Sequence, residues 1–162
     1  MKSTIISLIV MGSSLIACKQ SGVNSQTDSV RTMANQNTAD MKNLVSIVEI
    51  PTLDFKRAMD FYGTILDIKI EEVEFGGMKL GIFTGSEGSP TVQLVHADGY
   101  EPSANGTVVY LNGGSDLQKV LDKVELNGGT TVIPKTEIGP EMGFYAVFSD
   151  TEGNKVGLHS MK

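Results

Sequence analysis

Few side chains in this sequence could do chemistry, and the pair that best fits a catalytic role is Glu49 and His159. The chain has two histidines and one cysteine among its 162 residues. A carboxylate beside an imidazole raises the histidine pKa and fixes its tautomer, which is how a general base is assembled. Glu49 and His159 are therefore the candidate catalytic residues, if the fold brings the two ends of the domain together.

Other kinds of catalytic site find no support in the sequence. The glycine-rich segments lie at expected hairpins, whereas a phosphate-binding loop lies between a strand and a helix. A lone cysteine excludes an intrachain disulfide. No Ser–His–Asp order stands out. Acid–base chemistry and ligand binding are the functions that remain.

The elements that must position these residues fall into two similar halves. In the first half, residues 44–51 read as an apolar strand and Asp54 is placed to cap a helix over residues 55–66. Three strands should follow, at residues 69–75, 78–84 and 91–96. The pair Gly76-Gly77 fits a tight hairpin turn between the first two of these.

The same order of elements returns about 60 residues later, as an internal repeat would. Ser115 or Asp116 caps the second helix, which the glycines after Asn127 stop. The four strands of this half are predicted at residues 107–112, 130–133, 144–149 and 155–159. Residues 135–142 form either a lid or a simple connection. The sequence thus predicts an α+β fold, with two βαβββ modules paired into a curved eight-stranded half-open barrel and helices outside.

Three stretches of the chain resemble the vicinal oxygen chelate superfamily, which includes glyoxalases, bleomycin-resistance proteins and extradiol dioxygenases. The first is the helix start Asp54-x-x-Arg57-Ala58-x-x-Phe61-Tyr62 with the strand before it. The second covers residues 99–111. The third runs from Gly128-Gly129 to the tail Asp-Thr-Glu-Gly-Asn-Lys-Val-Gly-Leu-His at residues 150–159. Together they span residues 43–162, and their order supports the fold.

The resemblance also implies where a metal would be held. Metalloenzymes of the superfamily place their ligands on the first and fourth strands of each half, and the matching positions here are Ile47, Gln93, Thr107 and Gly157. Of these, only Gln93 has a side chain that could serve, and an amide oxygen is a weak ligand. Divalent metals need several His, Glu, Asp or Cys donors at one point. We therefore expect no cofactor; a recruited divalent metal is the less favoured alternative.

Strand alternation then places Glu49 inward beside Ile47, and His159 inward beside Gly157. The pseudo-symmetry of the two halves could bring Glu49 and His159 together across the cavity, where Gln93 could join them. Alternatively, such a pair is a structural hydrogen bond, or Glu49 fixes the turn at the next proline.

Aromatic residues of the domain should mostly pack in the core. These residues are Tyr62, Phe83, Tyr110, Phe144 and Tyr145. Phe144 and Tyr145 lie at the mouth of the second half and are the expected exceptions. With Gln93 and Thr107 they are the candidate ligand-binding residues. His96 has the opposite strand parity to Gln93, so it should face away from the cavity.

The first 17 residues read as a bacterial lipoprotein signal peptide, because a short apolar run follows Lys2. It ends at Leu15-Ile16-Ala17-Cys18, which resembles a lipobox, so Cys18 is expected to carry a lipid such as palmitate. The alternative is an exported protein with a free thiol. Residues 18–42 are polar and read as a disordered tether. The domain at 43–162 would then be a membrane-anchored lipoprotein of the cell envelope.

The net charge of the chain argues against some classes of binding partner. Removal of the predicted signal peptide, which contains Lys2, leaves 12 basic and 19 acidic residues, a formal net charge of −7. Nucleic acid and anionic lipid head groups both favour basic surfaces, so neither is an expected partner. The resemblance implies a small-molecule ligand and pairing into a homodimer.

Three functions follow. The first is metal-independent binding of a small organic molecule in the cavity. The second is a glyoxalase-type lyase, isomerase or epimerase that uses Glu49 and His159, with or without a recruited metal. The third is a structural role in which the cavity is packed solid. Whether the chain is an enzyme stays open at this point.

Overall fold

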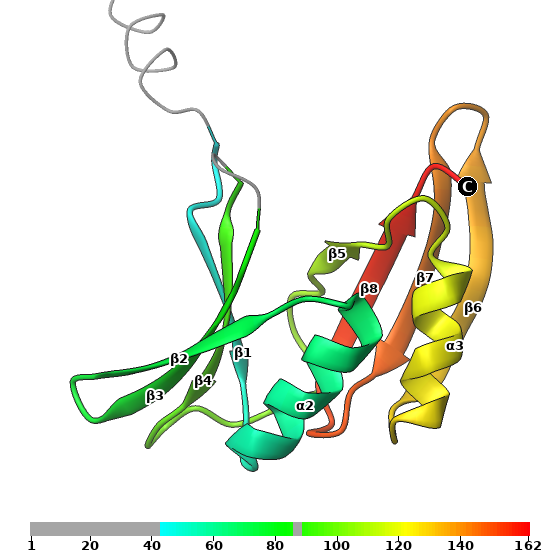
Figure 1. Cartoon of the computed structure of the whole chain (residues 1–162). Coiled ribbons are helices and arrows are strands. Elements are labelled where there is room, and N and C mark those ends of the chain that lie inside the picture. Colours follow the sequence, from blue (N-terminus) through cyan, green and yellow to red (C-terminus); the bar gives the residue numbers. More distant parts are fainter. Residues whose placement is uncertain (1–42, 86–88) are drawn as a thin grey trace, which may run out of the picture. The chain divides into compact units, whose positions relative to one another are not determined.

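The computed structural model describes residues 43–85 and 89–162 (Figure 1). The predicted signal peptide at 1–17, the lipidation site Cys18 and the tether up to residue 42 lie outside the described residues. Within the described part, no helix is both long and apolar enough to cross a membrane.

The first module is one helix and a four-stranded sheet in the order β1-β4-β3-β2, with β1 parallel to β4. Its elements are β1 (Ile47–Pro51), α2 (Phe55–Leu66), β2 (Ile70–Phe75), β3 (Met78–Phe83) and β4 (Thr91–His96). The predicted cap is confirmed, because the Asp54 carboxylate accepts a hydrogen bond from the Arg57 amide at 3.1 Å. This contact satisfies one of the free amides at the start of α2.

The second module repeats this plan in the order β5-β8-β7-β6, with β5 parallel to β8. Its elements are β5 (Tyr110–Asn112), α3 (Gln118–Leu126), β6 (Thr130–Gly139), β7 (Gly143–Ser149) and β8 (Lys155–Ser160). The N-cap of α3 is Leu117, which makes no side-chain capping bond, so the predicted cap at Ser115 or Asp116 was wrong; Asp116, one residue earlier, accepts a hydrogen bond from the Gln118 amide at 3.0 Å. The α+β class and the two βαβββ modules are therefore confirmed.

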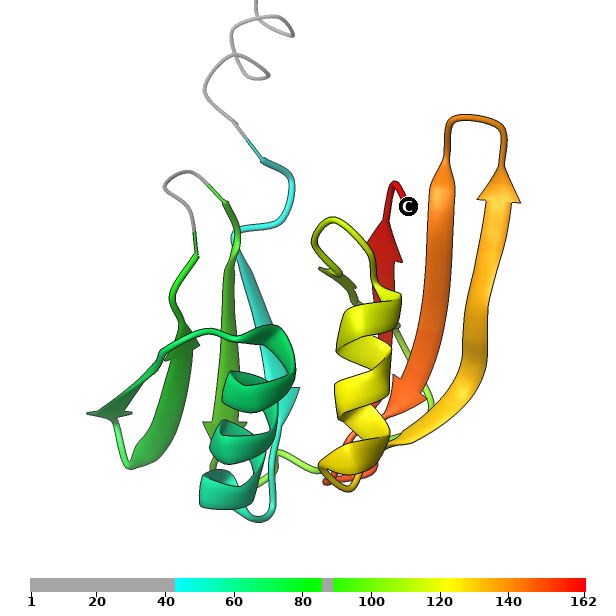
Figure 2. The same cartoon turned by 45° about the vertical axis from the view of Figure 1, so that its right-hand side comes forward.

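Among residues 43–85 and 89–162, the eight strands form two separate four-stranded sheets and no closed barrel. Helices α2 and α3 lie beside each other and pack on one side of the sheets (Figures 1 and 2). Buried apolar side chains fill the space between helices and sheets, for example Ile50, Leu94 and Leu158. The opposite face of each sheet, called the inner face below, carries the alternate residues, such as Glu49 and Gly157.

Two predicted boundaries were wrong. Residues 135–142 form neither a lid nor a loop, because β6 continues to Gly139 and turns directly into β7. The β-branched residues of this segment favour a strand. Pro134 is tolerated because β6 is an edge strand with register shifts on both sides of this proline. The fifth strand begins at Tyr110, so Thr107 precedes it.

The turn between β7 and β8 joins the two modules. The buried Asp150 accepts a hydrogen bond from the Tyr62 hydroxyl at 2.7 Å. The Glu152 carboxylate accepts the Leu53 and Asp54 amides, both at 2.8 Å, and the Arg57 side chain at 2.8 Å. The negative charge of this carboxylate at the N-terminus of α2 also interacts favourably with the helix dipole. The second module thereby holds the first at the N-terminus of α2.

These contacts change how Glu152 titrates. Burial opposes its ionisation, but the hydrogen bonds from Arg57 and from the two amides outweigh this effect and lower the pKa of Glu152. The carboxylate is therefore charged in the folded protein over the ordinary pH range.

Candidate functional site

The inner face of the first module carries a closed hydrogen-bond network around Glu49. Gln93 lies opposite Glu49 in the β1–β4 ladder and donates to one carboxylate oxygen at 2.9 Å. The Tyr100 hydroxyl, from the segment after β4, donates to the other oxygen at 3.0 Å. This second bond raises the pKa of the Tyr100 phenol. Both oxygens of Glu49 thus have a protein donor.

The inner face of the second module is aromatic instead. Tyr110 on β5 lies directly opposite Gly157 on β8, and Tyr145 on β7 lies opposite His159. The rings of Tyr110 and Tyr145 meet at a centroid distance of 6.3 Å with an interplanar angle of 62°. This edge-on geometry is one that aromatic pairs prefer.

Gly157 is required by the position of the Tyr110 ring. A Cβ atom built at residue 157 would lie within 2.7 Å of three carbons of that ring, which is closer than any normal contact. The Tyr110 ring therefore covers the backbone at the position where the resemblance implies a metal-binding glutamate. Any side chain at 157 would displace the ring.

Tyr110 and Tyr145 line a hollow of about 470 Å³ together with Ile138 and His159, and we call it the aromatic hollow. Half of the Tyr110 surface, 50%, is exposed there. The His159 Nε2 atom lies 2.9 Å from the Met142 carbonyl oxygen. Because a carbonyl only accepts, Nε2 carries the hydrogen, and Nδ1 is the acceptor of the neutral ring.

Glu49 lies elsewhere, beside a smaller hollow of about 170 Å³. Thr107, Asn154 and Lys155 also line this hollow, which lies where the two modules meet. Asn154 donates to the Pro51 carbonyl at 2.9 Å, so the turn that Glu49 was a candidate to fix is held by Asn154. The structure thus groups Glu49 with Gln93, Tyr100 and Thr107.

The predicted site residues are consequently divided between two places. Glu49 and His159 have different hydrogen-bond partners and line different hollows. Tyr145 lies in the aromatic hollow, as the sequence suggests. Phe144 has the opposite strand parity: it packs against the core cluster, with the Lys135 ammonium 4.7 Å from its ring centroid.

The residues at the four implied ligand positions do not fit a metal. Ile47 and Gly157 offer no side-chain donor, Gln93 offers a single amide oxygen, and Thr107 precedes the strand. Within residues 43–85 and 89–162, no three His, Cys, Asp or Glu side chains are grouped so that they could hold an ion. The Tyr110 ring also fills the space above Gly157.

Sequence reasoning missed two residues of the aromatic hollow. Tyr110 was expected to pack in the core, and Ile138 was placed in a loop. Strand alternation alone could not find Tyr110, because the start of β5 was set three residues too early. The ladder partner of Gly157 is the feature that identifies it.

Two modules of this kind, with an open inner face, define a glyoxalase-like fold. Residues 44–158 match the family model described as Glyoxalase/Bleomycin resistance protein/Dioxygenase superfamily, and the chain belongs to this superfamily. A glyoxylase-like domain-containing protein of Didymella fabae is 29% identical over 113 residues, which cover 68% of this chain and 88% of that protein.

Solved structures have the same fold at low identity. A glyoxalase/bleomycin resistance protein of Albidiferax ferrireducens aligns with a TM-score of 0.56 at 18% identity, over 72% of this chain and 97% of that chain. TnmS3, an antibiotic binding protein of a Streptomyces species, gives 0.51 at 17% identity, over 73% of this chain and 95% of that one. A glyoxalase I mutant of Zea mays gives 0.59 at 20% identity, and the 72% of this chain that aligns covers only 46% of the maize chain.

Proposed function

We propose that this chain is a binding domain that holds a small aromatic molecule in the aromatic hollow without a metal. The observation that carries this proposal is the Tyr110 ring above Gly157, because it places a binding surface where the superfamily places a metal ligand. Exposed aromatic rings beside open space are energetically suited to stacking with a ligand ring.

The hollow has the mixture expected of a small-molecule site. Its walls are apolar at Tyr110, Tyr145 and Ile138, and its polar groups are few. His159 offers an acceptor at Nδ1, and the Tyr145 hydroxyl is a further polar group. A ligand would therefore be an aromatic ring that bears one or two polar substituents.

The same geometry favours binding over the lyase, isomerase or epimerase alternative. Both oxygens of Glu49 already accept hydrogen bonds, from Gln93 and Tyr100, and these bonds hold the carboxylate in place. His159 lines another hollow. One ligand would therefore have to reach two separate hollows to react with both groups.

A ligand screen tests the proposal. Substituted phenols and naphthols would be titrated into the whole chain by isothermal calorimetry, with wild type, Tyr110→Ala and Tyr100→Ala compared. We expect at least one compound to bind, with about fivefold weaker binding to Tyr110→Ala, since one aromatic contact is worth about 1 kcal/mol. Tyr100→Ala is the matched control in the other module and should bind normally. Equal affinity in all three proteins would overturn the proposal.

We further propose that Cys18 carries a lipid that anchors the chain in the bacterial cell envelope. The lipobox-like sequence before Cys18 supports this location. Incorporation of labelled palmitate into wild type, and its absence from Cys18→Ser, is the expected result. Equal labelling would contradict it.

Pairing of two copies is also proposed, on the resemblance alone. Analytical ultracentrifugation should give twice the mass of the chain at micromolar concentration. A single-chain mass over the same range would contradict this assembly.

A further inference from the structure

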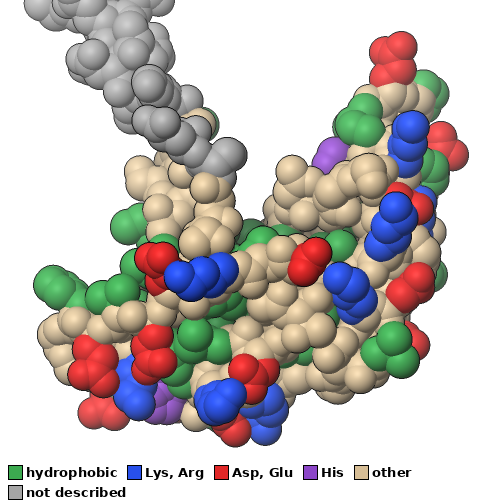
Figure 3. Space-filling view, in the orientation of Figure 1, with side chains coloured by type: hydrophobic (Ala, Val, Ile, Leu, Met, Phe, Trp, Pro, Cys, Tyr) green, Lys and Arg blue, Asp and Glu red, His purple; other side chains and the backbone are tan. Residues whose placement is uncertain are grey.

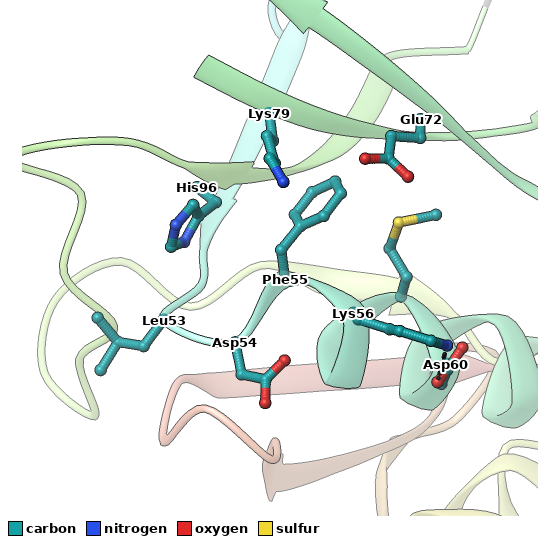
Figure 4. Close-up of a pocket in the computed structure, with 9 residues that line it drawn as sticks. Leu53, Asp54, Phe55, Lys56, Asp60, Glu72, Lys79 and His96 are labelled. Atoms are coloured by element: carbon teal, nitrogen blue, oxygen red, sulfur yellow. Dashed lines mark hydrogen bonds and ion pairs between the residues drawn. The ribbon is translucent and has the colours of Figure 1, made fainter. Parts of the chain in front are cut away.

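A third hollow lies on the opposite side of the first sheet, away from the inner face. Its volume is about 610 Å³, and it lies between the start of α2 and strands β2 to β4 (Figure 4). Phe55 and Met59 of α2 are its apolar lining on the side of the helix. We call it the outer hollow, and nothing in the proposed binding function uses it.

The sheet carries polar side chains on the face beside this hollow, and Glu72, Lys79 and His96 line the hollow itself. Glu74, Lys79 and His96 are ladder partners on three adjacent strands, so their side chains share one face. Figure 4 shows Lys79 between His96 and Glu72, with the ring of Phe55 below it. Figure 3 shows Lys, Glu and His side chains gathered in this part of the surface.

Two opposite charges of the hollow have no partner among the described residues. Lys79 and Glu72 make no hydrogen bond or ion pair there, and both side chains are exposed. The other charged groups differ in this respect. Lys56 is paired with Asp60 at 2.7 Å, and Asp54 caps α2. One ammonium and one carboxylate are thus available above an apolar floor.

His96 forms a fixed wall of the hollow. Its Nδ1 atom lies 3.0 Å from the Thr52 carbonyl oxygen, so Nδ1 donates and the neutral ring has its acceptor at Nε2. Thr52 is itself buried, with 1% of its surface exposed. The contact therefore holds the imidazole in one orientation and one tautomer.

We propose that the outer hollow binds a small zwitterion with an apolar side chain, of the type of an apolar α-amino acid. Its carboxylate would meet Lys79 and its ammonium Glu72, while the side chain packs on Phe55 and Met59. Like-charge repulsion supplies the specificity. A simple anion would meet Glu72, a simple cation would meet Lys79, and only a zwitterion satisfies both.

Amide-resolved NMR of the whole chain tests this site. L-leucine would be compared with isopentylamine and isocaproate, which each lack one of its charged groups. We expect leucine to shift the amides around Phe55, Lys79 and His96. Each analogue should bind at least about tenfold more weakly, because a hydrogen bond to a charged group is lost.

Variants separate the site from the aromatic hollow. Lys79→Gln and Glu72→Gln should each weaken leucine binding about tenfold, whereas Lys119→Gln on α3 and Tyr110→Ala should not. Equal binding of either analogue, shifts confined to the aromatic hollow, or no shift with millimolar leucine would each overturn the proposal. None of these results depends on a ligand in the aromatic hollow.

Discussion

The two modules share one fold but differ on their inner faces. In the first module, the two oxygens of Glu49 accept hydrogen bonds from Gln93 and Tyr100. In the second, Tyr110 and Tyr145 stand beside a hollow of about 470 Å³ with few polar groups. A polar group with all its partners in place stabilises structure, whereas an exposed aromatic surface still has binding energy to gain.

The two copies of the repeated module thus have different roles. The first module supplies a satisfied polar face, and the second supplies the ligand site. A single residue contributes much to this division, because only glycine at 157 leaves room for the Tyr110 ring. The following changes test whether the two inner faces differ as described, from the largest expected effect to the smallest.

The first prediction concerns the contact that joins the two modules into one cooperative unit. Asp150→Ala removes the buried acceptor of Tyr62 and of the Asn154 amide, and should lower the free energy of unfolding by about 3 kcal/mol. Urea denaturation measures it, with the exposed Asp98→Ala as control. A loss below about 0.5 kcal/mol would show that the turn does not join the modules.

The second change targets the ring above Gly157. Gly157→Ala should cost about 1–3 kcal/mol, since the new methyl group overlaps the Tyr110 ring. The double variant Gly157→Ala with Tyr110→Ala should recover much of that loss, as coupled neighbours do. Gly85→Ala is the control, because nothing lies within 4 Å of its added Cβ. Additive losses in the double variant would show that the two residues are not in contact.

The third test is the pH dependence of the contact between the modules. The folded pKa of Glu152 is lowered from its usual 4.5, so its stabilising effect is full above about that pH and is lost as the pH falls through the folded value. Wild type should lose stability on acidification more steeply than Glu152→Gln. Parallel curves between neutral pH and the acid limit of folding would contradict this role.

The smallest effect is expected at Glu49. Glu49→Gln keeps one acceptor oxygen for either Gln93 or Tyr100, and it lies outside the aromatic hollow. Affinity for the aromatic ligand, measured by calorimetry, should stay within about twofold of wild type, because the variant removes no contact to the hollow. A large loss would mean that both inner faces act on one ligand, as the lyase alternative requires.

The sequence was enough to predict the order of elements, since helical and strand periodicities are local. It could also identify the Asp54 cap. It failed at residues 135–142, where prolines and glycines suggested a lid or a connection; an edge strand with irregular register accommodates Pro134. Edge position is a property of the sheet and cannot be seen in a local window.

The candidate site was predicted only in part. Alternation from Gly157 put His159 on the inner face, and the β7–β8 ladder places Tyr145 opposite it. The partner of Gly157 depended on the register between β5 and β8, which two short strands separated by more than 40 residues do not specify. An error of three residues pointed to Thr107 instead of Tyr110. The hydrogen bonds that bind Glu49 to Gln93 and Tyr100 are likewise long-range.

The most direct test of the account is the affinity of the whole chain for its aromatic ligand before and after treatment with EDTA. The account predicts the same dissociation constant in both states, because Tyr110 occupies the space of a metal ligand. Loss of binding in EDTA that Zn²⁺, Ni²⁺ or Mn²⁺ restores would contradict it. That result would return attention to Glu49 and His159 as ligands of a recruited metal.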